Sequence, residues 1–177
     1  MFLQGLKDKF KHKSGEKYLK NELLKNPEIE RSKKGIKNVG VIVDLDTFDN
    51  ADYFQQFIEI FNLRPNAVKI IGYRGFYDKN SPYATPIFSD KDLGWGGAVE
   101  NSYALEFLTK EYDLLVNYYT RDTLILKLMT VKTKARIKVG FAEIDTELND
   151  LILQTQLQDF KTFKTELKKY LKVMNEL

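Results

Sequence analysis

The chain has 177 residues, 43% apolar and 30% charged, with no cysteine, one histidine and a formal net charge of +3. This length and apolar content suit one domain with a substantial core and exclude a wholly disordered chain. The absence of cysteine excludes a disulfide scaffold, a thiolate metal site and a cysteine nucleophile, and a single histidine disfavours a histidine-based triad or a multi-histidine metal site.

The basic excess is confined to the start of the chain. The first 35 residues hold ten of the 28 basic and five of the 25 acidic side chains, so they carry +5 and the other 142 residues carry −2. We therefore predict a basic helical arm over 1–35 and a single α/β domain over 36–177.

The beginning of this arm has an apolar stripe among lysines that includes Leu3, Leu6 and Phe10. Such a stripe can pack on the body, or it can make a weak peripheral membrane contact through residues 2–13. We expect it to pack on the body, and Ser14–Gly15 would allow the segment to hinge.

A strand-helix-strand pattern follows the arm. Residues 39–43 (VGVIV) form a continuous, largely β-branched run that is typical of a strand buried on both faces. After the good helix N-caps Asp49 and Asn50, apolar residues recur at i, i+3, i+4 and i+7, which predicts a helix that ends before Pro65. Residues 67–71 predict the next strand.

The segment 74–97 interrupts this alternation. It holds two of the four prolines, four of the ten glycines and the only tryptophan. Long loops inside compact domains are often functional. Residues 85–88 predict a short strand within it, and a helix is expected near 98–110.

The rest of the chain returns to buried strands and helices. Strands are predicted at 113–117, 137–141 and 151–153, and helices at 121–135 and 160–174. Alternating strands and helices indicate a parallel sheet with right-handed crossovers. The predicted fold is a three-layer α/β domain of Rossmann-like or flavodoxin-like kind, with four to five mainly parallel strands.

Candidate site residues follow from this fold class, because ligands of open parallel sheets bind beyond the carboxyl ends of the strands. Together with two residues of the long loop, the candidates are Asp44, Asp46, Arg74, Asp92, Trp95, Asn117 and Tyr119. We assign none of them a catalytic role, and we predict no metal ligand and no cofactor.

The segment Asp44-Leu45-Asp46-Thr47 resembles the first motif of haloacid-dehalogenase-type phosphatases. In such a site one aspartate is the nucleophile, the other is the acid/base, and Mg²⁺ screens the phosphate. The match is incomplete because no glycine follows Asp46 and no Ser or Thr ends the second strand. We expect at least one of the two aspartates to bind a backbone amide.

Standard nucleotide and nucleic-acid sites are disfavoured. The glycines of 94–97 have neither the Walker spacing nor its lysine, and no glycine follows the first strand. A charge of −2 on the body argues against a nucleic-acid channel.

Four segments of the chain resemble a family of short proteins of unknown function from flavobacteria and related Bacteroidetes. They are LRPN (63–66), KDLGWGG (91–97), YDLLVNYY (112–119) and LNDLIL (148–153). The resemblance covers nearly the full length and implies no activity.

The sequence alone therefore leaves the function open. Our first hypothesis is a cytoplasmic α/β domain, non-catalytic or of uncharacterised activity, that binds a protein partner, a second copy or an acidic surface. The alternative is a small metal-assisted hydrolase or transferase that uses Asp44 and Asp46.

Overall fold

The computed structural model describes residues 2–25, 33–78 and 80–177. Within them one sheet is formed by β1 (Val39–Asp44), β2 (Val68–Tyr73), β3 (Ile87–Phe88), β4 (Glu111–Tyr118), β5 (Lys134–Phe141) and β6 (Leu151–Leu153). All neighbouring strands are parallel, in the order β3-β2-β1-β4-β5-β6. This is the strand order of a doubly wound Rossmann sheet. The predicted fold class is confirmed, with six parallel strands in the described residues where four to five were expected.

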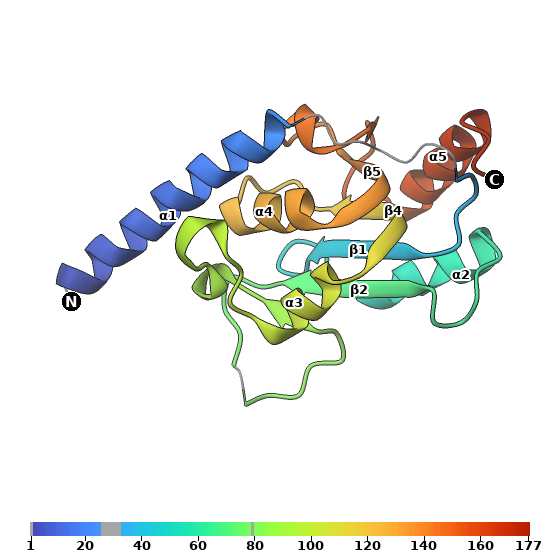
Figure 1. Cartoon of the computed structure of the whole chain (residues 1–177). Helices are drawn as coiled ribbons and strands as arrows, with labels where there is room; N and C mark the ends of the chain where they lie inside the picture. Colours follow the sequence, from blue (N-terminus) through green and yellow to red (C-terminus); the bar gives the residue numbers. More distant parts are fainter. Residues whose placement is uncertain (1, 26–32, 79) are drawn as a thin grey trace.

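Helices cover both faces of the sheet and complete the three layers (Figure 1). They are α1 (Phe2–Leu23), α2 (Gln56–Ile60), α3 (Ser102–Leu108), α4 (Leu124–Lys132) and α5 (Phe160–Val173). Short 3-10 turns are η1 (Ala51–Gln55), η2 (Asp90–Asp92), η3 (Trp95–Gly97) and η4 (Thr146–Leu148). The helix predicted before Pro65 is therefore divided into η1 and α2.

One apolar cluster fills each face of the sheet. On one face η1, α2 and α5 pack on β1, β4 and β5 through a connected group of rings: Phe48, Phe54, Phe57, Tyr118, Phe141, Phe160 and Phe163. On the other face α3, α4 and the second half of α1 pack on β1, β2 and β4. Because β1 lies between the two clusters, all six of its residues are buried, as the unbroken apolar run predicts.

The first helix differs from our expectation in two respects. It is continuous through Ser14 and Gly15, so this pair is not a hinge. A Cβ added at Gly15 would lie 3.2 Å from Leu124 of α4, and its absence lets the two helices approach closely. The stripe at the start of the helix does not pack on the body, because its side chains Leu3, Leu6 and Phe10 are 75%, 37% and 58% exposed.

Gly97 tests how α1 is held on the body. Its φ of +74° favours glycine, and a Cβ there would lie 3.0 Å from the Tyr18 ring of α1. We expect Gly97→Ala to cost about 1–2 kcal/mol in backbone strain and also to loosen α1, measured by urea denaturation and by hydrogen exchange of the α1 amides. Gly96→Ala is the matched control, since Gly96 has φ +62° but open space around its Cβ position. Equal α1 exchange in both variants would contradict the role assigned to this contact.

Candidate functional site

The carboxyl edge of β1 and β4 is the topological switch point of this sheet. The chain leaves β1 toward β2 on one side, and β4 lies on the other side. Rossmann-type sheets bind their ligands in the crevice between such a pair of strands. Here Asp44 ends β1, and Arg121 follows β4 by three residues.

Ion pairs join the two strand ends across this edge. The Arg121 Nε lies 3.0 Å from Asp44 Oδ2, and its Nη1 lies 3.4 Å from Asp46 Oδ2. Arg74, which follows β2, places Nη1 at 3.9 Å from Asp46 Oδ1 and donates from Nη2 to Asp49. We call Asp44, Asp46, Arg74 and Arg121 the carboxyl-edge cluster.

Backbone amides also bind both aspartates of this cluster. Asp44 Oδ1 accepts from the Asp46 amide at 3.0 Å, and Asp46 Oδ2 accepts from the Gly75 amide at 2.9 Å. We expected such a bond from at least one of the two residues. The carboxylates therefore fix the turn after β1 to the start of the loop that follows β2.

Burial dominates the electrostatics of the cluster. Asp44 is fully buried, and this burial raises the pKa of its carboxyl above the ordinary value, while the Arg121 charge acts in the opposite direction. Burial also raises the pKa of the Tyr73 hydroxyl, which donates to Asp90 Oδ2 at 2.7 Å. The Arg121 guanidinium lies 5.5 Å from the centre of the Tyr73 ring.

Three predicted site residues lie elsewhere, inside the fold. Asp92 is buried and accepts from the Ser89 amide at 2.8 Å, which completes the cap of η2. Asn117 and Tyr119 are buried beneath α4, where both bond to the Thr130 hydroxyl, at 2.9 and 2.7 Å. These bonds satisfy buried polar groups and hold elements together.

The remaining candidate, Trp95, lies on η3 beside α1, where the neighbouring Gly96 amide donates to the Ser14 hydroxyl. The structure thus brings Asp44, Asp46 and Arg74 together and leaves Trp95 and the three buried candidates outside the cluster. Arg121 was not among the predicted site residues. Its position shortly after the predicted strand at 113–117 could have placed it at the same edge of the sheet.

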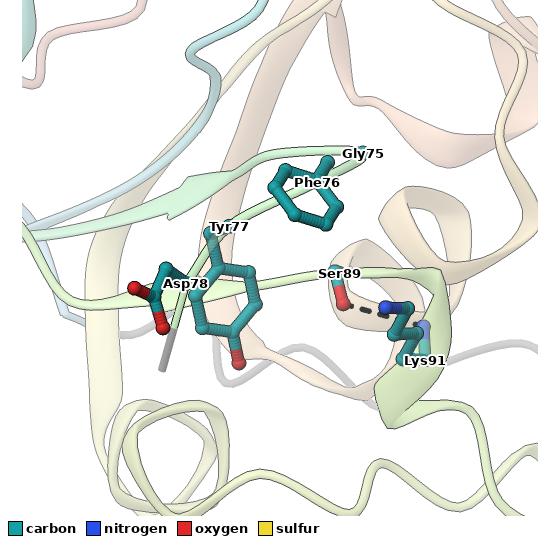
Figure 2. Close-up of a pocket in the computed structure, with 6 residues that line it drawn as sticks. All are labelled: Gly75, Phe76, Tyr77, Asp78, Ser89 and Lys91. Carbon is teal, nitrogen blue, oxygen red and sulfur yellow. Dashed lines mark hydrogen bonds between the residues drawn. The ribbon is translucent and has the colours of Figure 1, made fainter. Parts of the chain in front are cut away.

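A hollow of about 500 Å³ lies next to the cluster in the long loop. It is lined by Gly75, Phe76, Tyr77, Asp78, Ser89 and Lys91 (Figure 2). The Lys91 Nζ lies 5.4 Å from the centre of the Phe76 ring, and Phe76 is well exposed.

The sequence matches a family of unknown function (DUF6913) over residues 11–174. The chain belongs to this family. No curated protein and no solved structure matches it. The chemistry open to this DUF6913 member must therefore be argued from its own side chains.

The carboxyl-edge cluster is built to hold strands together more than to hold a metal. Each of its aspartates already binds an arginine and a backbone amide. Among residues 2–25, 33–78 and 80–177, no group of three or more His, Asp or Glu side chains could hold a metal ion.

A second cavity of about 780 Å³ lies at the opposite, amino edge of β4 and β5. Lys138 lines it and donates from Nζ to the Thr130 carbonyl, at 2.7 Å, in the last turn of α4. Burial lowers the pKa of this amine to about 8. The contact is the usual one between a lysine and the carboxyl end of a helix, and sequence reasoning did not identify it.

The first half of α1 is the other distinctive surface of this DUF6913 member. Residues 3–10 are all exposed, and the helix extends past α4 with its N-terminal end away from the sheet (Figure 1). Among the helices of the described residues, none has the length and apolar character needed to span a membrane.

Proposed function

We propose that this protein is a non-catalytic α/β domain that binds an acidic surface through the first half of α1. The observation that carries the proposal is the exposure of a basic helix end that continues without a break into the docked second half of α1 (Figure 1). The second half of α1 supplies the anchor, because Leu19 is buried against the body.

The charge of this helix end is available to a partner. Lys7, Lys9, Lys11 and Lys13 are exposed or half-buried, and in the described part of the chain none of them takes part in an ion pair. A near-neutral body with a concentrated basic extension favours association with an acidic surface. We also propose that residues 1–35 form a basic arm, that residues 36–177 form the α/β domain and that the protein is cytoplasmic. The range of its family over flavobacteria and related Bacteroidetes is likewise a proposal.

The alternative of a small metal-assisted hydrolase or transferase that uses Asp44 and Asp46 receives less support from the geometry. In such an enzyme the two carboxylates would have to face an open site, where a metal ion and a substrate could reach them. Asp44 is fully buried and paired with Arg121.

Removal of the four lysines tests the proposal. We expect the Lys7→Gln, Lys9→Gln, Lys11→Gln, Lys13→Gln variant to bind labelled polyglutamate at least about tenfold more weakly at low salt, because each lysine near an acidic surface contributes about 1 kcal/mol. Fluorescence anisotropy against polyglutamate measures the change, and added salt should reduce the affinity of the unmodified protein.

The matched control removes four lysines from α5 instead. Lys161, Lys168, Lys169 and Lys172 lie on the exposed side of that helix, so their replacement by Gln changes the net charge equally. An equal loss of binding in both variants would mean that net charge, and not the first half of α1, determines binding.

A further inference from the structure

We propose that the acidic surface bound by α1 is an anionic lipid bilayer, into which the apolar stripe of Leu3, Leu6 and Phe10 inserts. This inference rests on the proposed function and names its partner. It is carried by the exposed position of the stripe on the helix, by the lysines on either side of it, and by the continuity of α1 from the stripe to the docked residues.

The stripe lies before the residues of α1 that contact η3, and on the opposite side of the helix from Gly15, which contacts α4. At 3.6 residues per turn, Leu3, Leu6 and Phe10 fall within about 60° of one another. They lie about 120–180° from Gly15 and Leu19, and about 20–120° from Ser14 and Tyr18, which contact η3. The side of α1 that packs on α4 is therefore not the side that carries the stripe. The exposure of all three side chains agrees with this geometry.

Charged side chains are distributed as an interfacial helix requires. On the same projection Lys9 and Lys13 border the stripe on one side and Lys7 borders it on the other, whereas Asp8 lies on the opposite side of the helix. A helix with an apolar face and a lysine-rich border lies in the plane of a bilayer, with its lysines at the level of the anionic headgroups.

The lysines beside the stripe also argue against two other partners, a second copy of the chain and an acidic protein surface. Two copies joined through their stripes would bring lysines against lysines, which opposes association. An acidic protein surface would satisfy the lysines but would leave Leu3, Leu6 and Phe10 against polar groups. A bilayer accommodates both the charge and the apolar side chains.

Because the helix is already formed and docked, binding does not require a disordered segment to fold. One short stripe gives weak and reversible attachment. We therefore expect salt-sensitive binding to vesicles of phosphatidylcholine mixed with phosphatidylglycerol, and none to phosphatidylcholine alone.

The test replaces the stripe without changing the charge. Leu6→Gln with Phe10→Gln changes two exposed side chains, so the fold should be retained, and thermal unfolding checks this. We expect co-sedimentation with the mixed vesicles to weaken at least about tenfold, since burial of apolar surface is lost, while polyglutamate binding stays unchanged.

A fluorescent reporter then tests which face of the helix meets the lipid. In a Trp95→Phe background, which removes the only natural indole, Phe10→Trp should shift its emission to the blue with mixed vesicles and be quenched by brominated lipid. His12→Trp, on the other side of the helix, should show neither effect.

The results separate the two proposals. Polyglutamate binding that depends on the α1 lysines, without vesicle binding, overturns the lipid inference and leaves the proposed function standing. Vesicle binding that survives Leu6→Gln with Phe10→Gln, or equal blue shifts at both reporter positions, also overturns the insertion. Absence of binding to both probes removes both proposals.

Discussion

Arg121→Met should lower the free energy of unfolding at neutral pH by about 3 kcal/mol, because it leaves the fully buried carboxylate of Asp44 without its cationic partner. This is the low end of the range for breaking a buried pair. Arg121 keeps 37% of its side chain exposed, so water can partly replace it. Urea denaturation at neutral pH measures the change.

The pH dependence identifies Asp44 as the cause. Burial raises the pKa of this carboxyl above 3.8, and loss of Arg121 should raise it further. A carboxyl with a raised pKa in the folded state destabilises the fold once it ionises, and this cost disappears as the pH falls below both pKa values. The deficit of Arg121→Met should therefore close in mild acid.

Two further variants control this result. Adding Asp44→Asn to Arg121→Met removes the buried charge and should restore part of the stability at neutral pH. Arg74→Met, whose pairs with Asp46 and Asp49 are more exposed, should cost no more than about 1 kcal/mol. A deficit of Arg121→Met that is independent of pH would show that packing, and not the ion pair, explains it.

The order of elements was predictable because their signals are local. The run VGVIV gives β1, and the apolar spacing from Phe160 onward gives α5, whose buried side chains are Phe160, Phe163, Leu167 and Leu171. The ends of the elements were less predictable. β5 begins at Lys134, before the predicted 137, because the backbone of residues 134 and 135 pairs with Glu111 and Tyr112 of β4. The charged side chains in this stretch had hidden the start of the strand.

The composition of the carboxyl edge depends on contacts that local patterns do not contain. The strand-end rule places Asp44, Asp46 and Arg74 at one edge, and the structure brings them together. The same rule also selects Asn117 and Tyr119, whose side chains turn into the layer beneath α4 and bond to Thr130. The strand-end rule alone cannot tell residues that reach the carboxyl edge from residues that are buried under α4. The packing of α4 on the sheet decides which residues are buried.

The direction of the stripe on α1 also required the structure. Apolar residues among lysines are compatible with packing or with a lipid interface. The contacts of Gly15 with Leu124 and of Tyr18 with Gly97 hold the second half of the helix on the body. The stripe of Leu3, Leu6 and Phe10, which precedes them, stays exposed.

Glu176→Gln should lower the free energy of unfolding by about 2–3 kcal/mol at neutral pH, the scale of a charge-assisted hydrogen-bond network. Glu176 accepts from Arg136 Nη1 and Nη2 at 2.7 and 2.8 Å and from the Gly35 amide at 2.9 Å. Arg136 Nη2 also donates to the Gly35 carbonyl at 2.9 Å. The carboxylate thus joins the end of the chain to β5 and to the segment before β1, so its loss weakens three contacts at once.

The sign of the pH effect follows from Arg136, whose hydrogen bonds lower the pKa of the Glu176 carboxyl below its ordinary 4.5. The stability that this carboxylate contributes is therefore present above pH 4.5 and is lost as the pH falls through the lower pKa of the folded state. The difference in unfolding free energy between the unmodified protein and Glu176→Gln should therefore close in acid. It should close at a lower pH than the difference for Arg121→Met, because the pKa of Asp44 is shifted upward.

Glu166→Gln, which breaks a more exposed pair with Lys169, is the control and should cost at most about 0.5 kcal/mol. Equal costs for Glu166→Gln and Glu176→Gln in urea denaturation would show that the contacts of Glu176 with Arg136 and Gly35 do not stabilise the fold.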